Sequence, residues 1–246
     1  MTCRGAASDG RRRVAPALAA AVLLACAACA AAPDTPAATA RAVVPGPAGA
    51  ARLEAPPPSA RPRVVVLGDS LTAGLGLPVE EAYPAVLQRR VDAQGYDFDV
   101  VSAGVSGDTT AGGLSRLDWS LDGDVKVLVV ALGGNDGLRG LPVAEVKRNI
   151  SAIVREATRR KIAVLLAGME APPNLGPHYT SRFRQAFRDV ADEYDVAFVP
   201  FLLEGVAGIE DLNQADGIHP TAAGARIIAD TVWPALEPLL RTASAS

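Results

Sequence analysis

A short segment of this sequence places a carboxylate and an imidazole at a spacing suited to proton transfer. The chain has two histidines, and His219 follows Asp216 by three positions within the sequence DGIHP, residues 216–220. An imidazole titrates near neutral pH, and a nearby carboxylate fixes its tautomer and stabilises its protonated form. The second histidine, His178, has no acidic residue within seven positions on either side. We therefore predict that His219 is the general base.

Ser70 is the candidate nucleophile. It follows an apolar run at residues 64–67, within the sequence GDSL. A serine hydroxyl attacks a carbonyl carbon effectively only when a base removes its proton and nearby donors stabilise the resulting oxyanion. Serines at strand ends are more often turn residues or helix caps, so Ser70 alone is weak support for catalysis. The support for a catalytic Ser70 becomes stronger when the residues described below are considered with it.

Two further residues offer hydrogen-bond donors for such an oxyanion. Gly104 follows the apolar run at 98–101, and because it lacks a Cβ atom its backbone N–H can approach a ligand closely. Asn135 follows a Gly-Gly pair and carries a side-chain amide. Glycine and asparagine are also common in turns, so each signal alone is ambiguous. Together with Ser70 and the Asp-x-x-His segment, they favour a catalytic site over a set of turns.

These residues must be positioned by the elements that precede them. Five short aliphatic runs alternate with segments of helical periodicity, and the runs lie at residues 64–67, 98–101, 127–132, 164–167 and 197–200. Continuous apolar strands are buried on both faces, so this alternation predicts a parallel sheet with helices on each side. Ligands of such sheets bind beyond the carboxyl ends of the strands, where the candidate residues fall.

Four helices are predicted between and after the runs. Their apolar positions recur at helical spacing: Val79/Ala82/Val86/Val91, Val143/Val146/Ile150/Ile153/Ala157, Phe183/Phe187/Val190/Tyr194 and Ile228/Val232/Leu236/Leu239.

The motifs resemble those of the SGNH, or GDSL, hydrolases, whose four blocks centre on a serine, a glycine, an asparagine and a histidine. The corresponding blocks are GDSLTAGLG at 68–76, SAGVSGDTT at 102–110, GGNDGLRG at 133–140 and DGIHP at 216–220. The resemblance covers essentially the whole predicted domain. It is strongest to the exported acyl-thioesterase, arylesterase and lysophospholipase branch.

This resemblance implies roles for the candidate residues. Ser70 would be the nucleophile, His219 the base and later the acid for the leaving group, and Asp216 the carboxylate that orients His219. The backbone N–H groups of Ser70 and Gly104 and the side-chain amide of Asn135 would form the oxyanion hole. The resemblance also implies an α/β fold, a flavodoxin-like three-layer α/β/α sandwich with a five-stranded parallel sheet, which agrees with the five apolar runs.

The segments after the third and fourth runs supply candidates for substrate binding: Leu138, Arg139, Leu141, Pro173, Asn174 and Leu175. In the resembling family the first three belong to a mobile substrate loop, and the alternative is an ordinary solvated loop. Leu175 stands where close relatives often carry an aromatic residue, which indicates a different wall of the acyl pocket. Asp69, Asp108 and Asp136 are interpreted as helix caps, not as catalytic acids.

Other classes of function fit less well. A nucleotide- or flavin-binding sandwich would need a phosphate-binding loop, but the sequence has neither G-x-x-x-x-G-K-S/T nor a G-x-G-x-x-G in the required context. A zinc enzyme would find few ligands among two histidines and no cysteine after residue 29. We expect neither a cofactor nor a metal. A carbohydrate O-deacetylase of the same fold and a non-catalytic, surface-tethered binding protein remain as alternatives.

The sequence before the domain is typical of an export signal. Arg11–Arg13 precede an uncharged apolar stretch at 14–28, which is the order of charge and apolar residues in a signal peptide. Cys26 and Cys29 close this stretch and are candidates for lipidation, although neither lies in a clean lipoprotein box. Residues 30–62 are rich in alanine and proline and are predicted to be a disordered linker.

The predicted organisation is thus a signal peptide at 1–29, a linker at 30–62 and a hydrolase domain at 63–241. The formal net charge is −3, and no basic run interleaved with aromatic residues occurs in the domain, which argues against nucleic-acid binding. The expected partner is a small acyl ester or thioester substrate. No protein partner is implied, and a lipidated cysteine would tether the exported protein to a membrane; without lipidation it would be periplasmic.

Overall fold

The computed structural model describes residues 61–245. These residues form a five-stranded sheet in which every pairing is parallel and the spatial order is β2-β1-β3-β4-β5. The strands are β1 (Arg63–Gly68), β2 (Asp99–Gly104), β3 (Val125–Ala131), β4 (Ala163–Ala167) and β5 (Ala197–Val199). Each predicted apolar run overlaps one strand, so the predicted parallel sheet is confirmed.

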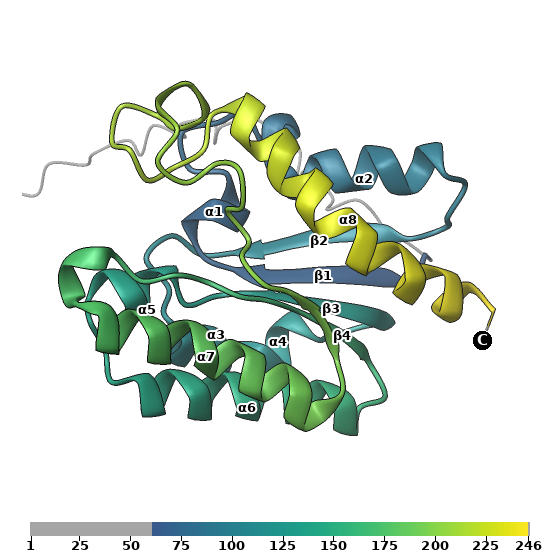
Figure 1. Cartoon of the computed structure of the whole chain (residues 1–246). Helices are drawn as coiled ribbons and strands as arrows, with labels where there is room; N and C mark the ends of the chain where they lie inside the picture. The colour runs from purple at the N-terminus through teal and green to yellow at the C-terminus, as the bar shows by residue number, and fades with distance from the viewer. Residues whose placement is uncertain (1–60, 246) are drawn as a thin grey trace, which may run out of the picture. The chain divides into compact units, whose positions relative to one another are not determined.

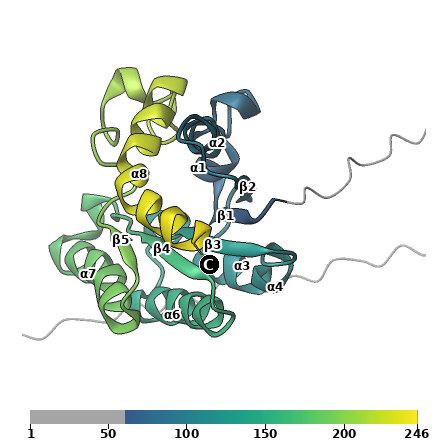
Figure 2. The same cartoon turned by 90° about the vertical axis from the view of Figure 1, so that its right-hand side faces the viewer.

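Helices cover both faces of the sheet and make three layers (Figures 1 and 2). On one face lie α2 (Tyr83–Ala93) and α8 (Ala222–Ser244). On the other lie α6 (Val143–Arg159) and α7 (Pro177–Tyr194), with α3 (Thr110–Ser115) beside α6. Shorter helical segments occupy the connections: α1 (Ser70–Ala73), η1 (Val79–Glu81), α4 (Leu117–Ser120), α5 (Gly134–Leu138), η2 (Pro173–Leu175) and η3 (Glu210–Leu212).

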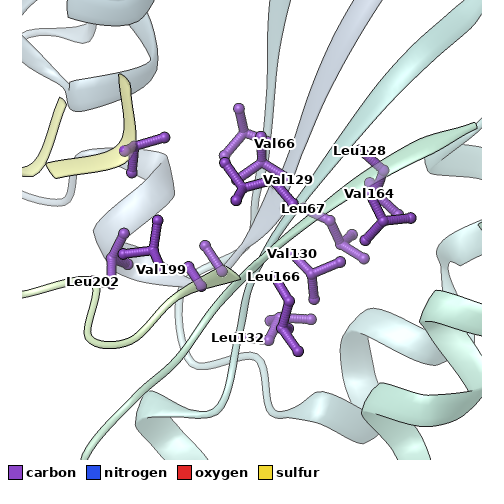
Figure 3. Close-up of a cluster of buried hydrophobic side chains, with 14 of the residues drawn as sticks. Val66, Leu67, Leu128, Val129, Val130, Leu132, Val164, Leu166, Val199 and Leu202 are labelled. Atoms are coloured by element: carbon purple, nitrogen blue, oxygen red, sulfur yellow. The ribbon is translucent and has the colours of Figure 1, made fainter. Parts of the chain in front are cut away.

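The central strands are apolar because both of their faces are covered. Val64–Leu67 of β1 and Val127–Ala131 of β3 are buried almost completely. Figure 3 shows side chains from β1 and β3 packed with side chains from β4, β5 and the segment after β5; those labelled are Val66, Leu67, Leu128, Val129, Val130, Leu132, Val164, Leu166, Val199 and Leu202. Truncation of such a side chain to alanine typically costs about 2–5 kcal/mol of stability, so these strands contribute strongly to the stability of the fold.

The predicted helices are present, with one correction at the first. Val79 was expected on the buried face of a helix that also includes Val91, but it lies in η1 and is 78% exposed. The helix α2 begins later because Pro84 occupies its first turn. Proline lacks an N–H and its ring clashes with the preceding turn, so it is tolerated in a first turn but not in the interior of a longer helix.

The structured domain extends slightly beyond its predicted limits of 63 and 241. Arg61 forms ion pairs with Asp92, Asp97 and Asp99 at 3.2, 2.7 and 3.1 Å, so the chain is already anchored before β1. At the other end α8 continues to Ser244. The predicted signal peptide, Cys26 and Cys29, and the linker up to residue 60 lie outside the described residues. Within residues 61–245, none of the helices has the length and apolar composition needed to span a membrane.

Candidate active site

The turn after β1 presents Ser70 at the carboxyl edge of the sheet. Asp69 precedes α1 as its N-cap, and its Oδ1 atom accepts a hydrogen bond from the backbone N–H of Leu71 at 3.0 Å. The expected capping role of Asp69 is therefore confirmed. Ser70 is the first residue of α1 and is 9% exposed, so it is mostly buried but still accessible to solvent.

The loop before α8 holds Asp216 and His219 in a compact turn. The Oδ1 atom of Asp216 accepts hydrogen bonds from the backbone N–H groups of Ile218 and His219 at 2.9 and 3.0 Å. Its Oδ2 atom lies 2.6 Å from Nδ1 of His219. These backbone hydrogen bonds, from His219 first and then Ile218, and the contact with the His219 ring hold the pKa of Asp216 below its usual value of 3.8. Asp216 is therefore an anion at neutral pH.

The two segments converge at the side chains of Ser70 and His219. Nε2 of His219 lies 2.9 Å from Oγ of Ser70, although the residues are 149 positions apart. The carboxylate of Asp216 at Nδ1 favours the tautomer that carries its proton there, which leaves Nε2 as an acceptor. The geometry thus allows Nε2 to take the hydroxyl proton of Ser70. His178, in contrast, is an exposed residue in the first turn of α7.

Asn135 lies beside this pair. It belongs to α5, which follows β3 through Gly133, a residue whose φ of 111° few other residue types adopt. Its Nδ2 atom donates to the backbone carbonyl of Asp108 at 2.9 Å and to Oδ2 of Asp69 at 3.3 Å. The amide is therefore anchored to the segments that follow β2 and β1.

Gly104 is not placed as the sequence predicted. It pairs with Gly68 at the end of β2, and a Cβ atom on it would lie 2.3 Å from the backbone nitrogen of Ala73. A glycine is needed there because the backbone of α1 packs against it. Gly104 does not border the cavity beside Ser70, whereas Gly107, three residues on and with a φ of 83°, does.

Ser70 and His219 line a cavity of about 830 Å³. This volume lies within the usual range for small-molecule sites. The apolar and aromatic side chains in its wall are Leu71, Leu75, Leu138, Met169, Ala171, Pro172, Pro173, Phe201, Leu203, Ala207 and Ile218. The wall also includes Asn135 and Glu170, and Glu170 is paired with Arg184 at 3.0 Å.

Of the six residues predicted to bind substrate, Leu138 and Pro173 line this cavity. The other four do not border it: Arg139, Leu141, Asn174 and Leu175. Arg139 instead donates from Nη2 to the carbonyl of Gly107 at 3.0 Å, and the carbonyl of Leu141 accepts a hydrogen bond from Tyr179 at 2.7 Å. These contacts hold the loop after α5 against its neighbours.

Much of the cavity wall consists of residues that the sequence pattern did not predict. Met169 follows β4, while Phe201 and Leu203 follow β5. Their positions in the chain could have indicated them, because every segment that follows a strand of a parallel sheet lies at the same edge of that sheet. Their apolar character alone did not separate them from core residues.

Two buried carboxylates lie near the site with different environments. Asp69 is 1% exposed, and burial raises its pKa to about 6. Asp136 is equally buried, but it accepts hydrogen bonds from the backbone N–H and the hydroxyl of Thr110 at 2.8 and 2.6 Å. Asp136 therefore accepts the first N–H of α3 from outside that helix. The expected capping role of Asp108 is wrong, because Thr109 is the N-cap of α3 and Asp108 pairs with Arg116 at 2.6 Å.

Comparison with known proteins adds an independent finding. Residues 66–227 match the model of the GDSL-like Lipase/Acylhydrolase family. The chain is 46% identical to Esterase TesA of Pseudomonas aeruginosa over 178 residues, which are 72% of this chain and 89% of that protein. It is 34% identical to Thioesterase 1/protease 1/lysophospholipase L1 of Escherichia coli K12 over 178 residues, covering 72% of this chain and 84% of that protein. The crystal structure of TesA superposes with a TM-score of 0.70 at 44% identity, covering 72% of this chain and 99% of the other.

Proposed function

The chain belongs to the GDSL-like lipase/acylhydrolase family, and we propose that it hydrolyses acyl esters and thioesters with Ser70 as nucleophile. The observation that carries this proposal is the 2.9 Å contact between Oγ of Ser70 and Nε2 of His219, two residues in the wall of a mostly apolar cavity. Asp216, at Nδ1 of the same ring, completes a Ser-His-Asp arrangement. Such arrangements are recognised by geometry and not by chain order.

In the first half of the reaction, Oγ of Ser70 attacks the carbonyl carbon while Nε2 of His219 accepts the hydroxyl proton. The carbonyl oxygen becomes an oxyanion in the tetrahedral intermediate. The intermediate collapses when the bond to the alcohol or thiol breaks and His219 returns the proton to that leaving group. An ester between the acyl group and Ser70 remains.

In the second half, His219 removes a proton from water and the resulting hydroxide attacks the acyl carbon. Collapse of the second tetrahedral intermediate releases the carboxylic acid and restores the hydroxyl of Ser70. The carboxylate of Asp216 stabilises the imidazolium in both halves without becoming protonated.

The donors proposed for the oxyanion are the backbone N–H of Ser70, the backbone N–H of Gly107 and one N–H of the Asn135 amide. For Asn135 this is the N–H that makes the longer of its two hydrogen bonds, at 3.3 Å to Asp69, which would turn to the oxyanion. Gly107 replaces Gly104 in this set because Gly107 borders the cavity and Gly104 packs under α1. The backbone N–H groups need no reorganisation during the reaction, which is why such donors contribute strongly to catalysis.

The cavity and the relatives support the proposed substrate class. A mostly apolar wall suits an acyl chain, since burial of apolar surface contributes roughly 25 cal/mol per Å². The relatives are named as an esterase and as a thioesterase and lysophospholipase. We accordingly place esters and thioesters of acyl chains ahead of acetylated sugars.

A labelling and hydrolysis experiment tests this proposal. A fluorophosphonate should label the wild-type protein and fail to label the Ser70→Ala variant. A chain-length series of p-nitrophenyl esters, measured beside acyl-CoAs, a lysophospholipid and an acetylated sugar, should show turnover of the acyl substrates. Absence of labelling in the folded wild-type protein would favour a non-catalytic binding protein, and turnover of the acetylated sugar alone would favour a deacetylase.

We also propose that the protein is exported. Either its signal peptide is cleaved and the protein is periplasmic, or it is tethered to a membrane through a lipidated Cys26 or Cys29. The support is the order of charged and apolar residues at 11–28. Cell fractionation and metabolic labelling with palmitate, with Cys26→Ser and Cys29→Ser variants, separate the two outcomes. Recovery of the full-length chain in the cytoplasm would contradict export.

A further inference from the structure

The loop that carries His219 is closed on itself by backbone hydrogen bonds. The backbone N–H of Gln214 donates to the carbonyl of His219 at 2.7 Å, and the N–H of Gly217 donates to the carbonyl of Gln214 at 2.8 Å. Asn213 and Pro220 pair as an antiparallel bridge at the base. These bonds fix the shape of the loop, but they do not fix its position relative to Ser70.

The side chain of Gln214 supplies that link. Its Nε2 atom donates to the carbonyl of Leu75 at 2.8 Å and to the carbonyl of Pro220 at 2.9 Å. Both partners are acceptors, so the amide nitrogen and not the amide oxygen must face them. One N–H therefore holds the segment after α1, and the other holds the loop that carries His219.

These bonds close a ring through the site. The backbone N–H of Leu75 donates to the carbonyl of Ser70 at 3.1 Å, and the carbonyl of Leu75 accepts from Gln214. Gln214 in turn donates its backbone N–H to His219, whose ring returns to the hydroxyl of Ser70. In Figure 1 the loop before α8 accordingly passes beside α1.

Gly76 makes room for this side chain. Its φ is +80°, and a Cβ atom on it would lie 2.2 Å from Oε1 of Gln214. A larger residue at this position is disfavoured by its backbone conformation and would also displace the amide.

We propose that Gln214 is a positioning residue that sets the distance between the Ser70 hydroxyl and the His219 ring by joining the segments that carry them. This inference rests on the proposed function, because it assigns Gln214 a role only through that pair. Gln214 touches neither the reacting carbonyl nor the transferred proton. Small misplacements of reacting groups, of the order of 1 Å, can lower rates by roughly 100-fold.

Steady-state kinetics on a short p-nitrophenyl ester test the proposal. Gln214→Ala should lower kcat by about 10- to 100-fold and change KM by less than about threefold, because Gln214 is not itself part of the cavity wall. Gln214→Glu, which has nearly the same shape but lacks the N–H donors, should be similarly slow. The rate of fluorophosphonate labelling should fall in parallel.

Gln88 provides a matched control. Its amide ties α2 to the start of β2 through the carbonyl of Phe98 at 3.1 Å and the N–H of Val100 at 2.6 Å, and none of these three residues borders the cavity. Gln88→Ala should lower the melting temperature yet keep kcat within about twofold. A loss of kcat in Gln214→Ala that exceeds that of an equally destabilised Gln88→Ala therefore reports on positioning, not on general stability.

A double-mutant cycle tests whether the effect of Gln214 on kcat passes through His219. In a His219→Ala background, Gln214→Ala should have almost no further effect on residual turnover, because its effect passes through His219. Full kcat in folded Gln214→Ala and Gln214→Glu, or a Gln214→Ala effect unchanged in the His219→Ala background, would overturn the positioning role. Loss of activity on His219→Ala with normal Gln214 variants would reject this inference alone, whereas an unaffected His219→Ala variant would reject the proposed function.

Discussion

The carboxylate of Asp69 is buried against the site and accepts a hydrogen bond from the amide of Asn135 at 3.3 Å. The same carboxylate caps α1, so a single side chain connects the candidate nucleophile segment with a proposed oxyanion donor. Its burial disfavours the charged form, and the pKa of Asp69 rises to about 6.

Stability should therefore depend on pH through Asp69. Between about pH 4 and pH 6 the folded protein keeps this proton while the unfolded chain has released it. The free energy of unfolding should fall as the pH rises through that window and level off above it. Urea unfolding of wild type and Asp69→Asn should show that the variant lacks this component. The exposed Asp192→Asn variant is the control, and an equal pH dependence in Asp69→Asn would contradict the prediction.

Removal of either member of the Ser70–His219 pair should abolish most activity. Ser70→Ala and His219→Ala are each expected to lower kcat by about 10⁴- to 10⁶-fold, because nucleophile and base act as a unit. Ester hydrolysis by purified, folded variants is the measurement. His178→Ala should retain full activity, and its inactivation with folding intact would show that the base was assigned to the wrong histidine.

The carboxylate of Asp216 should matter at every pH at which the enzyme works. Because its pKa lies below the usual range, Asp216 is charged throughout the neutral region. Asp216→Asn should lower kcat by about 10⁴-fold between pH 6 and pH 9 without a new inflection in the pH profile. Asp211→Asn, in the preceding η3 turn, serves as control and should leave kcat unchanged. A variant as active as wild type would remove Asp216 from the proposed triad.

The amide of Asn135 should contribute to the transition state and not to substrate binding. Asn135→Ala is expected to lower kcat by about 10²- to 10³-fold with little change in KM. Asn149→Ala is a suitable comparison because Asn149 bonds to Thr110 at 3.1 Å and does not border the cavity. An increase in KM with kcat preserved would place Asn135 in ground-state binding instead.

The cavity wall should set the preference for acyl-chain length. Ala207 borders the cavity and is exposed, so Ala207→Trp narrows the space without overpacking the core. We expect kcat/KM for p-nitrophenyl decanoate to fall by about tenfold or more while that for the acetate changes little. Ala93→Trp, at the exposed end of α2, controls for the added ring. Equal effects on both substrates would show that this wall does not contact the acyl chain.

Much of the fold was predictable from local pattern. The five apolar runs correspond to β1–β5, and the 17-residue α6 follows the apolar spacing from Val143 to Ala157. These patterns are strong because a strand covered on both faces, or a helix covered on one, can be stable only with apolar residues at those positions. The failure at Val79 is also local, since Pro84 limits where α2 begins.

The side chains available for chemistry could be identified from their types and positions along the chain. Ser70, Asn135, Asp216 and His219 stand after predicted strands or before the last helix, and parallel strands bring such positions to one edge. Tertiary structure decided which of two nearby glycines borders the cavity, because that depends on how β2 ends beneath α1. It also decided the role of Gln214, whose partner Leu75 lies 139 positions away. A hydrogen bond across that separation leaves no periodic signal in the chain, because it is set only when distant segments pack together.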